Sequence, residues 1–178
     1  FPPTIQFIEN HAFENIKTLI INGEIQKIPS NSFRYCYSLT KVILNTNTIN
    51  SIGSSAFEGC TSLSEITIPS SVQTIENNAF KGIQKLTISG DLQFIPEGTF
   101  RNCETLTKII FNTKTLTSFQ SFAFNECSSL TEITIPPTIK EIQYSAFMKC
   151  KSIKSIIIPS SMTSIQDSIF ENCFSLAK

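Results

Sequence analysis

The side chains with the most reactive chemistry in this chain of 178 residues are six cysteines and a single histidine, His11. Six cysteines in an extracellular protein would predict disulfide bonds, and cysteine together with histidine could bind zinc. The spacing disfavours zinc, because no two cysteines are separated by only two residues as in a C-x-x-C pair. We therefore predict no metal site.

Catalytic motifs are missing around His11. The sequence holds no serine elbow, no glycine-rich phosphate loop and no paired acidic motif that would accompany a histidine acting as a general base. His11 stands one position before the small residue that precedes Phe13, where we expect a solvated side chain in a turn. The sequence thus predicts a protein that is not an enzyme and that needs no cofactor.

All six cysteines occupy the same position of a repeated pattern, three residues after a phenylalanine. They are Cys36, Cys60, Cys103, Cys127, Cys150 and Cys173. In stacked coils, cysteines in one register would point inward beside the phenylalanines and behave as small buried hydrophobic residues. Adjacent coils could also bring Cys150 within bonding distance of Cys127 or Cys173, so bridging stays open as an alternative.

The phenylalanines define the repeat that must position these thiols. They are Phe13, Phe33, Phe57, Phe80, Phe100, Phe124, Phe147 and Phe170, at steps of 20, 24, 23, 20, 24, 23 and 23 residues. Self-similarity at such a period predicts a solenoid, in which each unit buries its apolar face only against its neighbours. One coil alone cannot fold, so stability is expected to come from contacts between repeats.

The repeats have two lengths. The units that begin at Phe13 and Phe80 lack three residues, including the cysteine, between the phenylalanine and the strand that follows. Residues 13–80 are identical to residues 80–147 at 33 of 68 positions, which indicates that a block of three units was duplicated. The unit at Phe147 breaks this regularity, because it keeps the full cysteine turn.

Each unit is expected to contain two extended segments. Around Glu65 and Thr67, the alternation of polar residues with Ile66 and Ile68 predicts a half-buried strand whose isoleucines face inward. A proline follows this strand in three units and should end it, because proline cannot donate to the ladder; these prolines are Pro69, Pro136 and Pro159. A second apolar pair, such as Val72 and Ile75, predicts a shorter segment on the opposite wall. The polar stretch around each phenylalanine is then expected to form a single helical turn.

Residues 54–75 read Ser-Ser-Ala-Phe-x-x-Cys-x-Ser-Leu-x-x-Ile-x-Ile-Pro-x-Ser-Val-x-x-Ile, and the pattern returns at residues 123–142. It closely resembles the BspA-like leucine-rich repeats, also called the Treponema pallidum type, over the whole chain. The resemblance implies an α/β solenoid: a right-handed leucine-rich-repeat superhelix with a parallel sheet on its concave face. Residues 1–178 would then form a single leucine-rich-repeat domain of about eight units. The departures are the two short units and Ile169, which stands where a small residue normally precedes the phenylalanine.

The same resemblance implies a function in binding proteins. Many members are surface or secreted proteins of host-associated bacteria and parasitic protists, with adhesion to host matrix proteins or other cells as the usual activity. We therefore expect a non-enzymatic module of a cell-surface adhesin or surface antigen. An intracellular scaffold on the same coil is the alternative, and the absence of Asn-x-Ser/Thr acceptors fits either an unglycosylated compartment or a surface free of sugars.

The composition and the two ends of the chain narrow the classes of binding partner that we expect. The 14 basic and 14 acidic residues cancel, and no basic cluster is present, so a nucleic-acid partner is not expected. The sequence contains no run of 18 apolar residues, so no membrane span is predicted. The chain begins and stops in the middle of a unit without polar caps, from which we expect a piece of a longer array or self-association through uncapped ends.

Two outward-facing rows are the candidate binding site. The positions equivalent to Thr67 are Ile20, Ile43, Thr67, Thr87, Ile110, Thr134 and Ile157. This row is unusually apolar for a wall that faces water, so it is either a β-branched ladder kept for strand propensity or an apolar stripe for recognition.

The positions equivalent to Glu65 form the second row and are expected to make a cross-strand ladder of ion pairs. They are Thr18, Lys41, Glu65, Lys85, Lys108, Glu132 and Ser155. Exposed pairs of this kind contribute little to stability. Five aromatic residues outside the repeat pattern are either partner anchors or incidental cover of neighbouring coils: Tyr35, Tyr37, Phe94, Phe122 and Tyr144.

Overall fold

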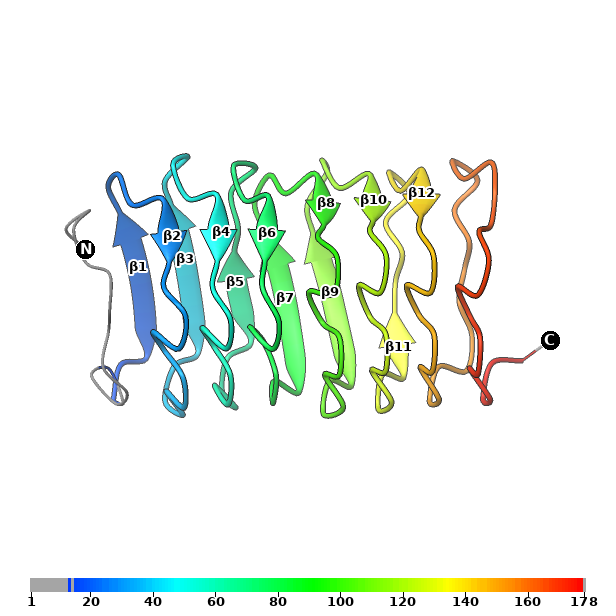
Figure 1. Cartoon of the computed structure of the whole chain (residues 1–178), viewed down its shortest axis with the longest axis horizontal. Helices are drawn as coiled ribbons and strands as arrows, with labels where there is room; N and C mark the ends of the chain where they lie inside the picture. The colour runs from blue at the N-terminus through cyan, green and yellow to red at the C-terminus, as the bar shows by residue number, and fades with distance from the viewer. Residues whose placement is uncertain (1–12, 14, 178) are drawn as a thin grey trace.

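The computed structural model describes residue 13 and residues 15–177, which wind into coils stacked along one axis (Figure 1). Six strands form one parallel sheet along the length of the stack, in the order β1-β3-β5-β7-β9-β11. Their bounds are β1 (Thr18–Asn22), β3 (Lys41–Asn45), β5 (Glu65–Thr67), β7 (Lys85–Ser89), β9 (Lys108–Asn112) and β11 (Glu132–Ile133). The predicted parallel-strand solenoid is confirmed.

Proline sets the length of these strands, as predicted. The four strands that no proline follows have five residues each, whereas β5 has three and β11 has two. Ile68 still donates its N–H to the carbonyl oxygen of Ser89 at 2.8 Å, and Pro69 next to it has no N–H to continue the ladder. Residues 155–158, which precede Pro159, form no strand at all.

Short strands build the opposite wall. They are β2 (Lys27–Ile28), β4 (Ser51–Ile52), β6 (Thr74–Ile75), β8 (Phe94–Ile95), β10 (Ser118–Phe119) and β12 (Glu141–Ile142). They form two parallel sheets, β2-β4-β6 and β8-β10-β12, and the second residue of every strand is buried. The predicted second extended segment is confirmed in these six units, with a break between β6 and β8. The last predicted pair, Met162 and Ile165, forms no strand, and the first, Ile5 and Ile8, lies outside the described residues.

The predicted helical turn is wrong. The residues two positions before and after each of the seven repeat phenylalanines from Phe33 to Phe170 adopt left-handed backbone angles, as Asn31 and Tyr35 do around Phe33, both with φ of 61°. A helix requires negative φ throughout. Instead, the N–H of Phe33 donates to the carbonyl oxygen of Ala56 in the next coil at 2.8 Å, while the N–H of Arg34 donates back to Asn31 at 3.2 Å. Successive N–H groups of the turn thus donate alternately within their own coil and to the next coil. Residues 13 and 15–177 contain no helix.

The phenylalanines form the continuous internal column that the repeat predicts. From Phe13 to Phe170, successive ring centroids lie 5.0–5.8 Å apart. The closest pair is Phe124 and Phe147, whose planes differ by only 4°. The six rings between the two ends are buried, each against the ring before it and the ring after it.

One strand pair departs from the register that the repeat alignment predicts. Between β5 and β7, Ile66 lies opposite Ile88 instead of Leu86, although the other pairs of the six-stranded sheet follow the alignment. The slip occurs where a full unit meets a unit that lacks three residues, and Figure 1 shows β7 and β9 beginning lower than β5. Because the slip is two residues, inward side chains stay inward.

Gly90 allows the backbones to approach closely at this offset. Its φ is +105°, and a Cβ atom there would lie 2.2 Å from the carbonyl oxygen of Ile68. Gly23 occupies the equivalent position of the first block with the same φ, but no described atom lies within 4 Å of its Cβ position. The two glycines therefore share a backbone conformation and differ in their neighbours.

This difference predicts the effect of an added methyl group. Gly23→Ala should lower the free energy of unfolding by about 1–2 kcal/mol, the cost of a left-handed L-residue. Gly90→Ala should lower it by roughly 1–3 kcal/mol more, because the methyl group also collides with Ile68. Urea unfolding followed by circular dichroism measures both, and equal losses would contradict a close approach at Gly90.

Candidate protein-binding surface

We call the outward side chains of the six-stranded sheet the outer face. Large apolar side chains are exposed on it: Ile20 is 54% exposed and Ile110 is 46% exposed, and Ile157, beyond the last strand, is 84% exposed. Ile43 is half-buried. The other predicted members of the apolar row, Thr67, Thr87 and Thr134, are also half-buried or exposed. All seven side chains of the predicted row therefore reach solvent.

The prediction of one continuous apolar row is nevertheless wrong, because the row is divided between β5 and β7. Ile20, Ile43 and Thr67 lie side by side on β1, β3 and β5. The register slip then places Ser89 opposite Thr67, whereas Thr87 lies between Glu65 and Ile110. The outer face consequently has two halves offset by two residues, which is about 6.6 Å along a strand.

The predicted charged row is present but interrupted at the same place. Lys41 pairs with Glu65 at 2.9 Å between Nζ and Oε1, and Lys108 pairs with Glu132 at 2.5 Å. The hydrogen bond from Lys108 lowers the pKa of Glu132 below its usual value. Lys85 does not join Glu65, because the slip puts Thr87 there, and on the other side Lys85 lies opposite Lys108. The predicted ladder is thus two separate ion pairs.

A shallow cleft of about 330 Å³ lies on the second half of the outer face. The ion pair of Lys108 and Glu132 lines it together with Ile110, Thr134 and the prolines after β11. Four of the predicted site residues are thereby gathered around one depression. It forms where β11 ends early, so the proline that shortens the strand also opens the surface.

The thiols lie inside the coils. All six cysteines are free and buried. The thiol of Cys60 donates to the carbonyl oxygen of Phe33 in the preceding coil, with 3.0 Å between Sγ and O, and Cys127 and Cys150 make the equivalent bonds at 3.1 Å. The interpretation of buried, unbridged thiols is confirmed, and the bridged alternative is not what the structure shows.

Burial also makes the thiols unreactive. Loss of solvation raises the pKa of Cys60 and Cys103 to about 12 and that of Cys173 to about 11. Since the thiolate is the nucleophile and the metal ligand, these neutral groups serve packing. Within the described part of the chain, no three side chains of histidine, cysteine, aspartate or glutamate gather as metal ligands would. His11 lies outside the described residues.

Four of the five aromatic residues outside the repeat pattern gather in two clusters, which sequence reasoning missed. The rings of Tyr35 and Tyr37 stack at 6.0 Å, and the guanidinium of Arg34 lies 4.7 Å from the centre of the Tyr35 ring. Arg34 also lies 3.2 Å from a carboxylate oxygen of Glu58. Tyr37 is 50% exposed.

The second cluster joins Phe122 and Tyr144, whose rings meet edge to face at 5.5 Å, with Arg101 5.4 Å above the Phe122 ring. Arg101 is the equivalent of Arg34 one block later, but the rings that the two arginines contact stand at different positions of the repeat. Phe94, the fifth ring, is half-buried in β8.

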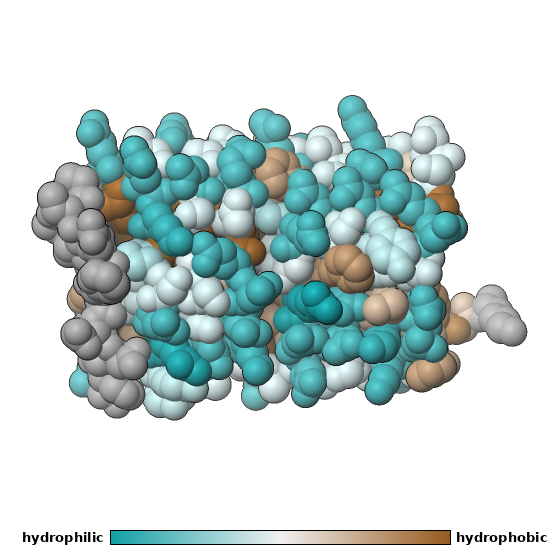
Figure 2. Space-filling model, in the orientation of Figure 1, coloured by the Kyte–Doolittle hydropathy of each residue, from teal (hydrophilic) through white to brown (hydrophobic). Residues whose placement is uncertain are grey.

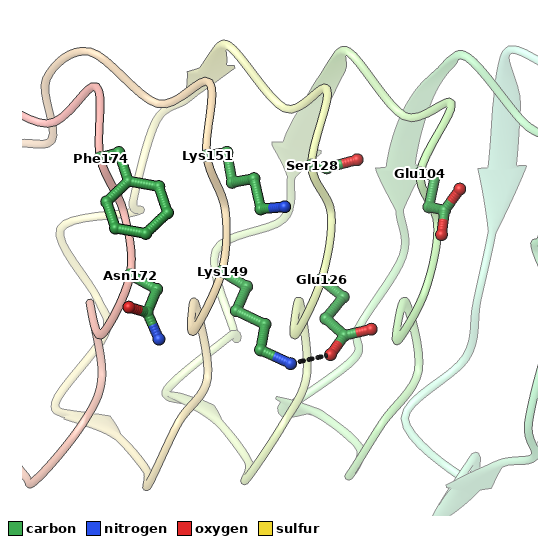
Figure 3. Close-up of a pocket in the computed structure, with 7 residues that line it drawn as sticks. All are labelled: Glu104, Glu126, Ser128, Lys149, Lys151, Asn172 and Phe174. Atoms are coloured by element: carbon green, nitrogen blue, oxygen red, sulfur yellow. Dashed lines mark hydrogen bonds and ion pairs between the residues drawn. The ribbon is translucent and has the colours of Figure 1, made fainter.

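Another depression, of about 530 Å³, lies on the turns of the last coils (Figure 3). Lys149 lies 2.6 Å from Glu126 there and lowers the pKa of that carboxyl. Glu104 and Lys151 add one further charge of each sign, so the depression has no net charge. The side of the molecule seen in Figure 2 is mostly hydrophilic, with apolar residues in isolated spots. The outer face is therefore the stronger candidate.

Comparison with known proteins identifies the repeat. The family model for the BspA-type leucine-rich-repeat region matches residues 1–87 and 81–178, in six copies. The chain belongs to the BspA-type leucine-rich-repeat family. Families of leucine-rich-repeat proteins are typically protein-interaction modules. Among the described residues of this BspA-type chain there is no apolar helix of membrane-spanning length.

Solved structures are similar to this BspA-type chain. The leucine-rich-repeat protein of T. pallidum is 25% identical with a TM-score of 0.53, over 90% of this chain and 67% of that one. A leucine-rich cell surface protein of Faecalibacterium prausnitzii is 26% identical with a TM-score of 0.46, over 94% of this chain and 60% of that one. The chain thus spans about two thirds of these relatives or less. No curated protein matches it.

The buried thiols predict how stability depends on pH. Unfolded thiols lose their protons near pH 9, whereas the folded thiol of Cys103 keeps its proton until about pH 12. The stabilisation that comes from burying this neutral thiol is therefore complete below pH 9 and is lost as the pH rises towards 12, by up to about 1.4 kcal/mol per pH unit.

Urea unfolding between pH 8 and pH 11 measures this slope. Cys103→Ala should reduce the slope of the unfolding free energy against pH by the contribution of one thiol. Lysines and tyrosines contribute equally to both chains, so comparison with the parent chain removes their effect. Identical slopes in the two chains would contradict burial of a neutral thiol at Cys103.

Proposed function

We propose that this chain is a protein-binding module, without catalytic activity, whose interface is the outer face. The observation that carries the proposal is the exposure of large isoleucines on a regular sheet, 54% at Ile20 and 46% at Ile110. Ion pairs flank both halves of the face, at Lys41 and at Lys108. Apolar side chains surrounded by charge are the arrangement of an interface core with a polar rim.

Strand propensity alone does not account for these isoleucines. Threonine is β-branched too and is favoured in strands without exposing a large apolar surface. The chain uses threonine at three equivalent positions, Thr67, Thr87 and Thr134. Isoleucine at Ile20 and Ile110 therefore exposes apolar area that the strand does not need, and covering it with a partner would return about 25 cal/mol for every Å².

The partner we propose is a protein on a host or neighbouring cell, such as a matrix or cell-surface protein, with this chain as part of a surface adhesin or antigen. The resemblance to BspA-like repeats supports it, as does the F. prausnitzii relative, which is described as a cell surface protein. In the right-handed superhelix expected for a single domain spanning residues 1–178, the outer face would be the concave one.

The free thiols favour a second candidate, an intracellular scaffold that binds proteins through the same face. Disulfides persist in oxidising compartments and are rare in the cytosol, and the six cysteines here are free. Their burial also protects them outside the cell, so the thiols fit both locations. Self-association of copies of the chain is a third candidate, which the oligomeric state in solution tests.

Substitution of the exposed isoleucines tests the interface. The triple change Ile43→Ser, Ile110→Ser and Ile157→Ser should leave the fold intact, because the side chains are outward, and weaken binding at least tenfold. Tenfold corresponds to about 1.4 kcal/mol, less than the burial of one large aliphatic side chain contributes. The measurement is capture from an extract of host cells on the immobilised chain, followed by affinity for the captured partner.

A matched control replaces three exposed apolar residues elsewhere: Tyr37→Ser, Ile165→Ser and Phe174→Ser. We expect this variant to bind as the parent chain does. If the control loses binding and the outer-face variant keeps it, the interface lies on the turns or the last coil and the proposal fails. Antibody labelling of intact cells separates the surface protein from the intracellular scaffold.

A further inference from the structure

Lys85 is a cation of the outer face without a carboxylate of its own. Within the described residues, the other strand lysines, Lys27, Lys41 and Lys108, each pair with a glutamate, and Lys85 makes no ion pair. Its partner across the strands is Lys108. Like charges directly opposite each other on neighbouring strands are destabilising, so the pairing of Lys85 with Lys108 costs the fold stability.

The offset between the two halves causes this isolation. In the register that the repeat predicts, Lys85 would lie opposite Glu65. In the structure Thr87 takes that place, and Glu65 is already paired with Lys41. Both glutamates near Lys85 on this face are already paired: Glu65, diagonal to it on β5, with Lys41, and Glu132, two strands away, with Lys108.

The duplication shows that the charge is not simply carried over from the repeat. The first block has Thr18, Lys41 and Glu65 at the three equivalent positions, with no net charge, and the second has Lys85, Lys108 and Glu132, with one excess positive charge. The block kept its ion pair when it was copied, and the position next to the pair is a lysine in only one copy. Only the second half of the face thus has a free cation.

Apolar surface lies next to this cation. Two residues further along the same strands, on the same face, Thr87 lies opposite Ile110, which is 46% exposed. Ile110 also lines the cleft of about 330 Å³ that extends to the prolines after β11. A ligand that fills this place would present a negative charge to Lys85 and an apolar group to Ile110, separated by about two residues of extended chain.

We propose that the second half of the outer face recognises a protein segment in which an aspartate or glutamate stands next to an aliphatic or aromatic side chain. The carboxylate pairs with Lys85, beside Lys108, and the apolar side chain enters the cleft over Ile110. This specificity rests on the proposed function, because it assigns the chemistry of the partner at the interface proposed above. Desolvated lysine–carboxylate pairs give selectivity by charge complementarity.

Selection from a phage-displayed library of random 12-residue peptides on the immobilised full chain tests the proposal. Peptides that also bind the Ile110→Ser chain are removed, so the remainder depends on the outer face. We expect these peptides to be enriched in aspartate or glutamate within two residues of an apolar side chain. Their affinity should fall at least tenfold on Lys85→Gln and should weaken as salt is raised.

Lys151→Gln is the matched control, because Lys151 is also an exposed lysine and lies on the turns of the coils (Figure 3). This variant should bind the peptides as the parent does. Circular dichroism and urea unfolding of Lys85→Gln should show an unchanged fold and no loss of stability, since the substitution removes a repulsion. A loss of stability would mean that Lys85 supports the fold, which would overturn the proposal.

Two other outcomes separate this proposal from the proposed function. If the selected peptides depend on Ile110 but hold no acidic residue, or bind Lys85→Gln unchanged, the carboxylate specificity is wrong and the outer face remains the interface. If no peptide depends on Ile110, neither the specificity nor the interface at this cleft stands.

Discussion

The stacking of one phenylalanine ring on the next is the interaction on which the rest of this structure depends. Each ring between the ends of the column is buried only because another ring lies on either side of it, at 5.0–5.8 Å between centroids. Holding the rings in line fixes the turns around them, in which the amide of Phe33 reaches the next coil and the thiol of Cys60 reaches back to the Phe33 carbonyl. The stability of a coil therefore resides in its contacts with its neighbours.

The outer face has two halves because one strand pair is out of register. The short units keep their strands in line with the full unit that follows them, at β1–β3 and β7–β9, whereas β7 pairs two residues out of register with β5 of the full unit before it. The strand of Lys85 slips by two residues, Gly90 accommodates the approach to Ile68, and the apolar and charged rows are each divided. The register between β5 and β7 thus determines which side chains meet on the surface that is proposed to bind proteins.

The sequence predicted much of the fold because the deciding residues are local. Pro69 ends its strand wherever the strand lies, and the spacing of Val72 and Ile75 marks the second wall. The helical turn was a wrong prediction although the signal was present, since glycine or asparagine often flanks the phenylalanines and tolerates positive φ, as Gly59 does. The slip at Lys85 could not be predicted, because a shift of two residues keeps every inward residue inward and leaves the hydrophobic pattern unchanged.

A double-mutant cycle on the Phe124–Phe147 pair tests the central claim most directly, with leucine at each position and urea unfolding as the measurement. The rings stack at 5.0 Å, so the two losses of stability should be coupled by about 0.5–1.5 kcal/mol. The same substitutions at Phe33 and Phe147, which are five coils apart, should be additive within about 0.5 kcal/mol. Additivity at the neighbouring pair would mean that each phenylalanine stabilises its own coil alone, and the account of a mutually supporting column would be wrong.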